Sequence, residues 1–106
     1  MQGNVARRIF LDGKAPAATL AKALRKRLPD AAPSYEDMFQ RCIGCEQYGD
    51  GQVTLASQET LDSDLRGRVH ITLITHGLDE DRFEAARDEW WTWWCCQVDS
   101  PELAVA

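Results

Sequence analysis

Among the residues of this 106-residue chain that could do chemistry, the four cysteines have the spacing most similar to a known site. Cys42 and Cys45 form a Cys-x-x-Cys pair, which occurs in dithiol redox centres and in zinc sites, and Cys95 and Cys96 are adjacent. A redox pair is activated at the N-terminus of a helix, whereas this pair falls at the end of a predicted helix, where the dipole disfavours the thiolate. We therefore expect buried, reduced cysteines, with a zinc- or thiol-dependent module as the alternative.

Both histidines of the chain, His70 and His76, lie on one face of a predicted strand. Six residues of strand span about 20 Å, which is too far for a shared metal ion or a shared proton. The sequence pattern places no nucleophilic side chain and no carboxylate beside either histidine. The sequence thus predicts no catalytic, cofactor-binding or metal-binding residue, and we expect a protein that is not an enzyme.

Charge is distributed unevenly along the chain, which has a formal net charge of −5. The stretch up to Pro29 carries seven basic residues and one acidic residue, and the stretch from Asp30 carries five basic and sixteen acidic residues. Folding either brings these opposite charges together or leaves one basic and one acidic face. A basic helix with Lys22, Arg25 and Lys26 makes nucleic-acid binding a second alternative, although no phosphate-binding motif accompanies it.

All four tryptophans of the chain stand in the segment EWWTWWCC, residues 89–96. On a helix, Trp90 and Trp94 share the centre of an apolar arc, because successive residues turn by about 100°. Trp91 and Trp93 lie at the two edges of this arc, about 160° apart. We expect the central pair to be core residues. At least one of the flanking pair should stay substantially exposed, because a single flat sheet cannot cover both.

The tryptophan segment also has an acidic border, and the two features together favour a protein interface. Tryptophan is enriched at the hot spots of protein interfaces, and carboxylates around it attract a basic partner. The predicted partner-binding residues are Trp91, Trp93, Glu84, Asp88 and Glu89. We expect a small acidic protein-binding module, of the kind with which a phage or mobile element inhibits a host protein by occupying its basic surface. A homodimer through the same residues is equally compatible with the pattern.

The rest of the sequence supplies the elements that must hold these residues. Apolar spacing, helix caps and glycine-containing turns divide the chain into six elements. They are a strand over 5–12, a helix over 15–28, a second helix over 34–46, strands over 53–56 and 68–76, and a helix that begins after Gly77. We expect the last two strands to be antiparallel neighbours joined by the loop 58–67.

This order, β-α-α-β-β-α, predicts an α+β fold in which helices pack on one face of a small, largely antiparallel sheet. The length and a hydrophobic content of 44% fit a single domain over residues 1–106. No element is predicted after about residue 99, where a flexible tail is allowed. No segment is apolar enough to cross a membrane and the first residues lack the features of an export signal, so a cytoplasmic protein is expected.

Overall fold

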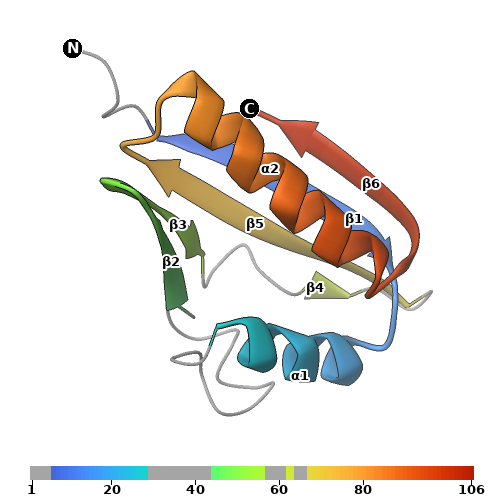
Figure 1. Ribbon diagram of the computed structural model, residues 1–106. Helices are drawn as coiled ribbons and strands as arrows, with labels where there is room; N and C mark the ends of the chain where they lie inside the picture. The colour runs from blue at the N-terminus through green and yellow to red at the C-terminus, as the bar shows by residue number, and fades with distance from the viewer. Residues whose placement is uncertain (1–5, 29–43, 57–61, 64–66) are drawn as a thin grey trace.

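The computed structural model describes residues 6–28, 44–56, 62–63 and 67–106, and these form an α+β fold (Figure 1). The elements follow one another as β1 (Arg7–Lys14), α1 (Ala17–Arg27), β2 (Gly44–Tyr48), β3 (Gly51–Leu55), β4 (Asp62–Ser63), β5 (Arg68–His76), α2 (Glu80–Cys95) and β6 (Asp99–Val105). The fold class predicted from the sequence is confirmed. Neither of the two described helices has the length and apolar character to span a bilayer.

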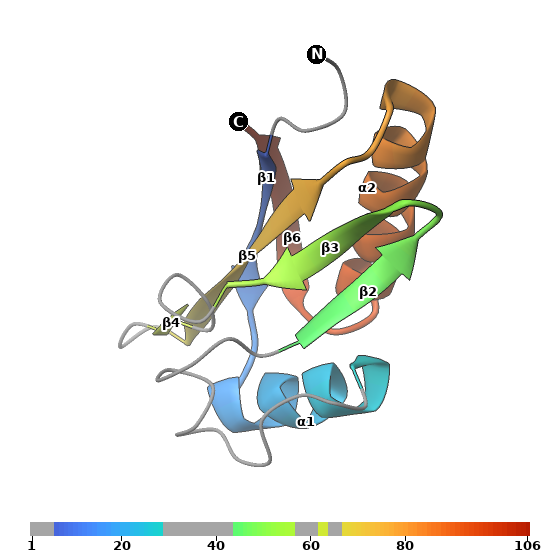
Figure 2. The same cartoon turned by 90° about the vertical axis from the view of Figure 1, so that its left-hand side faces the viewer.

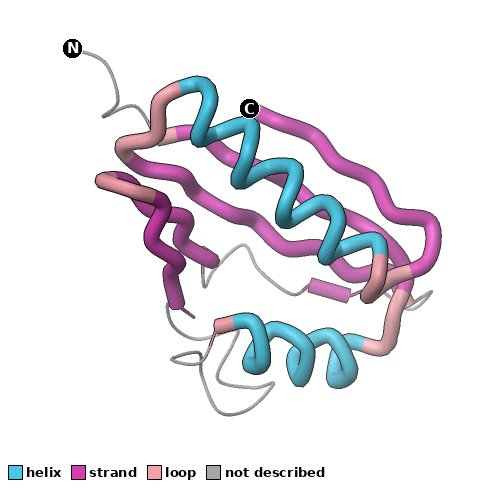
Figure 3. Tube along the Cα trace, in the orientation of Figure 1, coloured by secondary structure: helices cyan, strands magenta, loops and turns pink. Residues whose placement is uncertain are grey.

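The strands form an antiparallel sheet with the order β2-β3-β5-β1-β6, and the short β4 pairs with β5 beside this path (Figure 3). At the centre of the sheet, Ile9 and Leu11 of β1 lie opposite Leu73 and Ile71 of β5, and all four are buried. The two-residue period of the strands directs these apolar side chains to one face. The predicted antiparallel pairing of β3 with β5 is confirmed.

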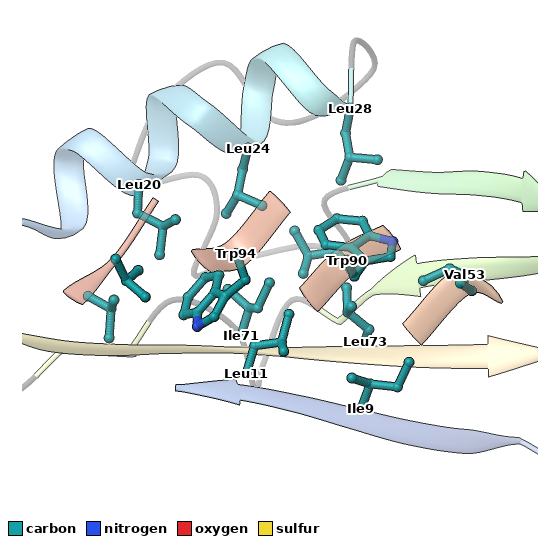
Figure 4. Packing of buried hydrophobic residues seen from close by; sticks show 14 of the residues in the cluster. Ile9, Leu11, Leu20, Leu24, Leu28, Val53, Ile71, Leu73, Trp90 and Trp94 are labelled. Atoms are coloured by element: carbon teal, nitrogen blue, oxygen red, sulfur yellow. The ribbon is translucent and has the colours of Figure 1, made fainter. Parts of the chain in front are cut away.

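The apolar core lies between this face of the sheet and the two helices (Figure 2). α2 runs along the sheet, and α1 lies across one end, below the C-terminal half of α2 (Figure 1). Leu20, Leu24 and Leu28 form a row along α1 because residues four apart share one side of a helix. This row points toward Trp90 and Trp94 of α2, so that both helices contribute to a single core (Figure 4).

α2 begins where the sequence predicted. Asp79 is its N-cap residue, and the carboxylate of Asp79 accepts a hydrogen bond of 2.8 Å from the main-chain N–H of Arg82. Glu80 and Asp81 occupy the first turn, where negative charge stabilises the positive end of the helix dipole. The capping residue and the acidic turn therefore fix where α2 begins.

The hairpin formed by β2 and β3 replaces the end of a predicted helix. Residues 44–46 belong to β2, whereas the sequence indicated a helix over 34–46, and the other residues of that helix lie outside the described part of the chain. Gly49 takes a φ of 62° in the two-residue turn between the strands, a conformation that favours glycine. The Gly49-Asp50 pair is a known hairpin signal that indicates β2 as well as β3.

β6 was not predicted, because the residues from about 99 onward were expected to form no element. Residues 99–105 instead extend the sheet by pairing with β1. The chain that leads from α2 into β6 passes close to β1, where a Cβ on Gly13 would overlap the side chain of Val98. The local sequence, DSPELAV, has weak strand propensity, so that pairing with β1 rather than local preference creates this strand.

Candidate functional site

The two central tryptophans of α2 are core residues, as the sequence predicted. Trp90 and Trp94 are 1% and 0% exposed. The Nε1 of Trp94 donates a hydrogen bond of 2.9 Å to the main-chain oxygen of Asp12, and the Nε1 of Trp90 donates one of 3.1 Å to Oε1 of Glu46. A buried indole N–H needs an acceptor, so these two bonds tie α2 to β1 and to β2.

The two flanking tryptophans, Trp91 and Trp93, are both half-buried, which corrects the expectation that one of them would be substantially exposed. That expectation assumed a helix lying on a flat sheet. In the structure, α1 and the β2–β3 hairpin border one side of α2, and β6 borders the other (Figure 1). Trp93 also packs against Trp90 with the ring centroids 5.3 Å apart in an edge-to-face arrangement. Both edges of the apolar arc therefore have neighbours.

A polar cluster centred on Glu46 of β2 closes the side of α2 that carries Trp93. Its Oε1 accepts hydrogen bonds from Nε1 of Trp90 at 3.1 Å, the hydroxyl of Tyr48 at 3.2 Å and Nη2 of Arg27 at 3.3 Å. The Nε of Arg27 lies 3.1 Å from Oε2, close enough for an ion pair although its N–H is not aligned for a hydrogen bond. The Glu46 and Arg27 side chains are only 22% and 16% exposed, so this partly desolvated pair joins α1, β2 and α2.

The guanidinium group of Arg27 also contacts the tryptophans. Its Cζ lies 4.0 Å from the ring centroid of Trp90 and 5.6 Å from that of Trp93, within the range of cation–π attraction. At the other end of α2, Arg7 forms an ion pair of 3.1 Å with Glu80. Basic residues of the N-terminal region therefore pair with acidic residues of the later part of the chain. This is the first of the two outcomes expected from the charge distribution, in which folding brings the opposite charges together.

Tyr48 connects Glu46 with the exposed surface of α2. Its hydroxyl lies 3.3 Å from Oε1 of Glu89 as well as 3.2 Å from Oε1 of Glu46, and the hydroxyl donates its single proton toward these two carboxylates. Burial, together with the negative charges of Glu46 and Glu89, raises the pKa of Tyr48 well above its ordinary value. The hydroxyl therefore keeps its proton at neutral and mildly alkaline pH.

Two hollows open on this side of α2, and Arg27 and Glu89 line both of them. The first has a volume of about 460 Å³ and is called the Trp93 hollow; it is lined by Arg27, Asp88, Glu89, Thr92 and Trp93. The second has a volume of about 600 Å³ and is called the Tyr48 hollow; it is lined by Arg27, Glu46, Gln47, Tyr48, Gly49 and Glu89. The polar cluster therefore forms the wall between two concave surfaces that carry aromatic rings and carboxylates.

The structure brings three of the five predicted partner-binding residues together. Trp93, Asp88 and Glu89 line the Trp93 hollow. Glu84 lies exposed on the outer surface of α2. Trp91 lies on the opposite side of the helix, toward β6, because it is about 160° away from Trp93 around the helix axis. The predicted set is thus divided between two surfaces.

Sequence reasoning missed three residues of the site, namely Arg27, Glu46 and Tyr48. Arg27 lies within the predicted basic helix but was not given a role there, and Glu46 was placed at the end of a predicted helix. The Gly49-Asp50 turn is the signal that identifies Glu46 and Tyr48, because a strand that ends at Tyr48 places both residues on the same face. No local signal pairs Arg27 with Glu46.

Cys45, Cys95 and Cys96 are exposed free thiols, which corrects the expectation that the cysteines are buried. Cys42 lies outside the described part of the chain. Cys45 is exposed because the alternation of β2 turns Glu46 toward the helices and its neighbour away from them. Within the described ranges, no group of three or more cysteine, histidine or acidic side chains is arranged to hold a metal ion.

Comparisons with models of protein families, with curated proteins and with solved structures give no match for this chain.

Proposed function

We propose that this protein is a cytoplasmic protein-binding module without enzymatic activity, and that its Trp93 hollow receives a basic side chain of the partner. The observation that carries the proposal is the lining of this hollow, in which a half-buried indole lies beside the exposed residues Asp88 and Glu89. A guanidinium or ammonium group is attracted both by the face of an indole and by a carboxylate. The hollow therefore offers the two groups that recognise an arginine or lysine side chain.

The charges around the hollow favour a cation over an anion. The positive charge of Arg27 is already paired with Glu46. The ion pair of Asp88 with the neighbouring Arg87, at 3.2 Å, is exposed and therefore weak. Glu89 accepts a hydrogen bond from a neutral tyrosine, a contact that leaves its negative charge in place.

The outer surface of α2 extends this negative charge beyond the hollow. Glu80, Asp81 and Glu84 are exposed along the same helix. A row of carboxylates attracts a basic surface from a distance and orients it before contact. This supports a partner whose basic surface ordinarily meets an anion such as nucleic acid, and the proposed role is that of an inhibitor of the phage or mobile-element type.

The proposal is tested by capturing binding proteins from a host-cell extract, identifying them by mass spectrometry, and measuring the affinity of the purified partner calorimetrically. Trp93→Ala should weaken binding by about 2 kcal/mol, or roughly 30-fold, as expected of an interface hot spot. Trp91→Ala is the matched control, because the two residues are both half-buried at the edges of the same helix. It should change the affinity less than about threefold.

The double substitution Asp88→Asn with Glu89→Gln tests the electrostatic part of the proposal. It should weaken binding and reduce the dependence of the affinity on salt, because two exposed charges no longer attract the partner. The proposal is wrong if Trp91→Ala weakens binding more than Trp93→Ala does, or if added salt strengthens the complex.

A further inference from the structure

The outward side of β6 carries main-chain groups that pair with no described strand, as the hydrogen bonds between β1 and β6 indicate. Arg8 and Ala106 exchange both main-chain bonds, each 3.0 Å long. Bonded and non-bonded pairs alternate in an antiparallel ladder, so Ala104 is bonded to β1 whereas Leu103 and Val105 direct their N–H and C=O groups away from it. β6 is the last strand of the described sheet, and no described strand pairs with this side.

The side chains of the same two residues make this edge apolar. Val105 is 39% exposed and is the large apolar side chain that the described part of the chain leaves most open. Leu103 is half-buried, and it lies beside Val105 on the face of the sheet that α2 covers, because they stand opposite Leu11 and Ile9. Exposed strand edges of natural proteins are usually protected by charge or proline. In β6, the last proline and the last charged residue are Pro101 and Glu102, so Leu103 and Val105 at the end of the strand lack this protection.

We propose that β6 pairs with β6 of a second copy of this chain, in the antiparallel direction, with Ala104 on the twofold axis. Leu103 of one copy then exchanges main-chain hydrogen bonds with Val105 of the other, and both pairs of apolar side chains meet on the α2 side of a continuous sheet. The Trp91 side of α2 faces the same junction.

The edge fits a second copy because it is complementary to itself. The two outward residues offer equal numbers of donors and acceptors, symmetric about Ala104, which is the condition for a twofold contact. Glu102 stands opposite Ala106 of the other copy, so that the two carboxylates are not brought face to face. The net charge of −5 on each copy opposes association, and the dimer should therefore become tighter as salt screens the repulsion.

Proline substitutions at adjacent positions separate dimerisation from folding. Val105→Pro removes an N–H that is unpaired in the monomer, so it should weaken self-association by about tenfold or more and leave the melting temperature of the monomer unchanged. Ala104→Pro removes an N–H that pairs with β1, so it should lower the melting temperature. Sedimentation equilibrium over a range of concentrations and salt measures the association of each variant.

Cysteine cross-linking tests the register, in a background in which Cys42, Cys45, Cys95 and Cys96 are replaced by serine. Ala104→Cys should form a disulfide-linked dimer under mild oxidation, because residues opposite each other at a non-bonded position have Cα atoms about 4.5 Å apart. Glu102→Cys, on the same face of the same strand, is the control. Its two sulfhydryl groups would be roughly 13 Å apart along the strands and should not cross-link.

The proposal is overturned if the wild-type chain is monomeric at all concentrations and salt conditions, if Val105→Pro associates as the wild type does, or if Glu102→Cys cross-links as efficiently as Ala104→Cys. It uses a different surface from the Trp93 hollow and does not depend on the proposed function. The two proposals also have opposite salt dependence, since salt should weaken binding of a basic partner and strengthen self-association.

Discussion

The two long sides of α2 are held in different ways. On the side that faces α1 and β2, one carboxylate, that of Glu46, contacts polar groups of Arg27, Tyr48 and Trp90, which come from all three neighbouring elements. On the side that faces β6, the half-buried Trp91 and Leu103 pack against the core, and β6 ends the described sheet with outward main-chain groups that pair with no described strand. The first side is joined by directional bonds and the second by apolar contact.

This difference explains why the two sides suit different kinds of partner. A hydrogen bond to Glu46 holds Arg27, and Trp93 packs edge-to-face against the buried Trp90. The hollow beside these two residues therefore exists before any ligand arrives, and little ordering is required on binding. Apolar contacts impose no such geometry, and the edge beside them offers its main-chain groups to another strand. A preformed hollow fits a protruding side chain, whereas an open edge fits a backbone.

The largest expected effect concerns the residue that lies between the two sides. Trp94→Ala removes a fully buried indole and its hydrogen bond to β1, and it should lower the free energy of unfolding by about 3 to 5 kcal/mol. Chemical denaturation measures this, with Trp91→Ala as the control. A loss no greater than that of Trp91→Ala would contradict the assignment of Trp94 to the core, and with it the division of α2 into two sides.

A smaller effect should follow when the polar side is broken. Glu46→Ala leaves the partly buried Arg27 and the indole N–H of Trp90 without their acceptor, which should lower the free energy of unfolding by about 2 to 3 kcal/mol. Glu46→Gln keeps an acceptor oxygen and should have a smaller effect. On the opposite side of the molecule, Glu102 is 69% exposed and lies 3.9 Å from Arg68, so Glu102→Ala should change stability by less than about 0.5 kcal/mol.

Equal losses for Glu46→Ala and Glu102→Ala would show that the cluster around Glu46 contributes no more than a surface ion pair. A loss for Glu46→Gln as large as that for Glu46→Ala would show that the charge itself, rather than the acceptor oxygen, holds the three elements together, because both variants lack the charge and only Gln keeps the oxygen. Both outcomes would contradict the picture of one side of α2 fixed by directional bonds.

The features of α2 that depend on this helix alone were predicted correctly from the sequence. The start of this helix after Gly77 and the apolar arc centred on Trp90 and Trp94 both follow from residues within about four positions of one another. The strand pair β3 and β5 follows from alternation in each strand. In these segments the local pattern and the fold require the same arrangement.

Several features that depend on neighbours distant in the sequence were missed or wrong, although the pairing of β3 with β5 was predicted. The burial of Trp91 and Trp93 is set by β6 and by α1, and the position of a residue around a helix axis contains no information about either. The pairing of Arg27 with Glu46 joins a helix to a strand, and β6 owes its conformation to β1 rather than to its own residues. Only β2 had a local signal that indicated it, in the Gly49-Asp50 turn.

The smallest expected effect is a change in the pH dependence of stability, which reports on the hydroxyl proton of Tyr48 on the polar side. Burial and the charges of Glu46 and Glu89 raise the pKa of Tyr48 in the folded protein, whereas in the unfolded chain the tyrosine ionises near its ordinary value of about 10. The folded state therefore binds this proton more tightly. The stabilisation is fully present below about pH 10 and is lost as the pH rises further, because the unfolded chain gives up its proton first.

Tyr48→Phe removes both the hydroxyl and its titration. At neutral pH the variant should be slightly less stable than the wild type, since the hydrogen bonds to two carboxylates are lost. Above about pH 10 the difference should shrink, because only the wild type still has a Tyr48 proton to lose on unfolding. Other groups that titrate in this range are present in both proteins and cancel in the comparison. Trp91→Phe, from the apolar side, should follow the wild-type curve at a constant offset. A Tyr48→Phe curve that is also parallel to the wild type would mean that the hydroxyl does not hold its proton between Glu46 and Glu89, and that the two sides of α2 differ less than their contacts indicate.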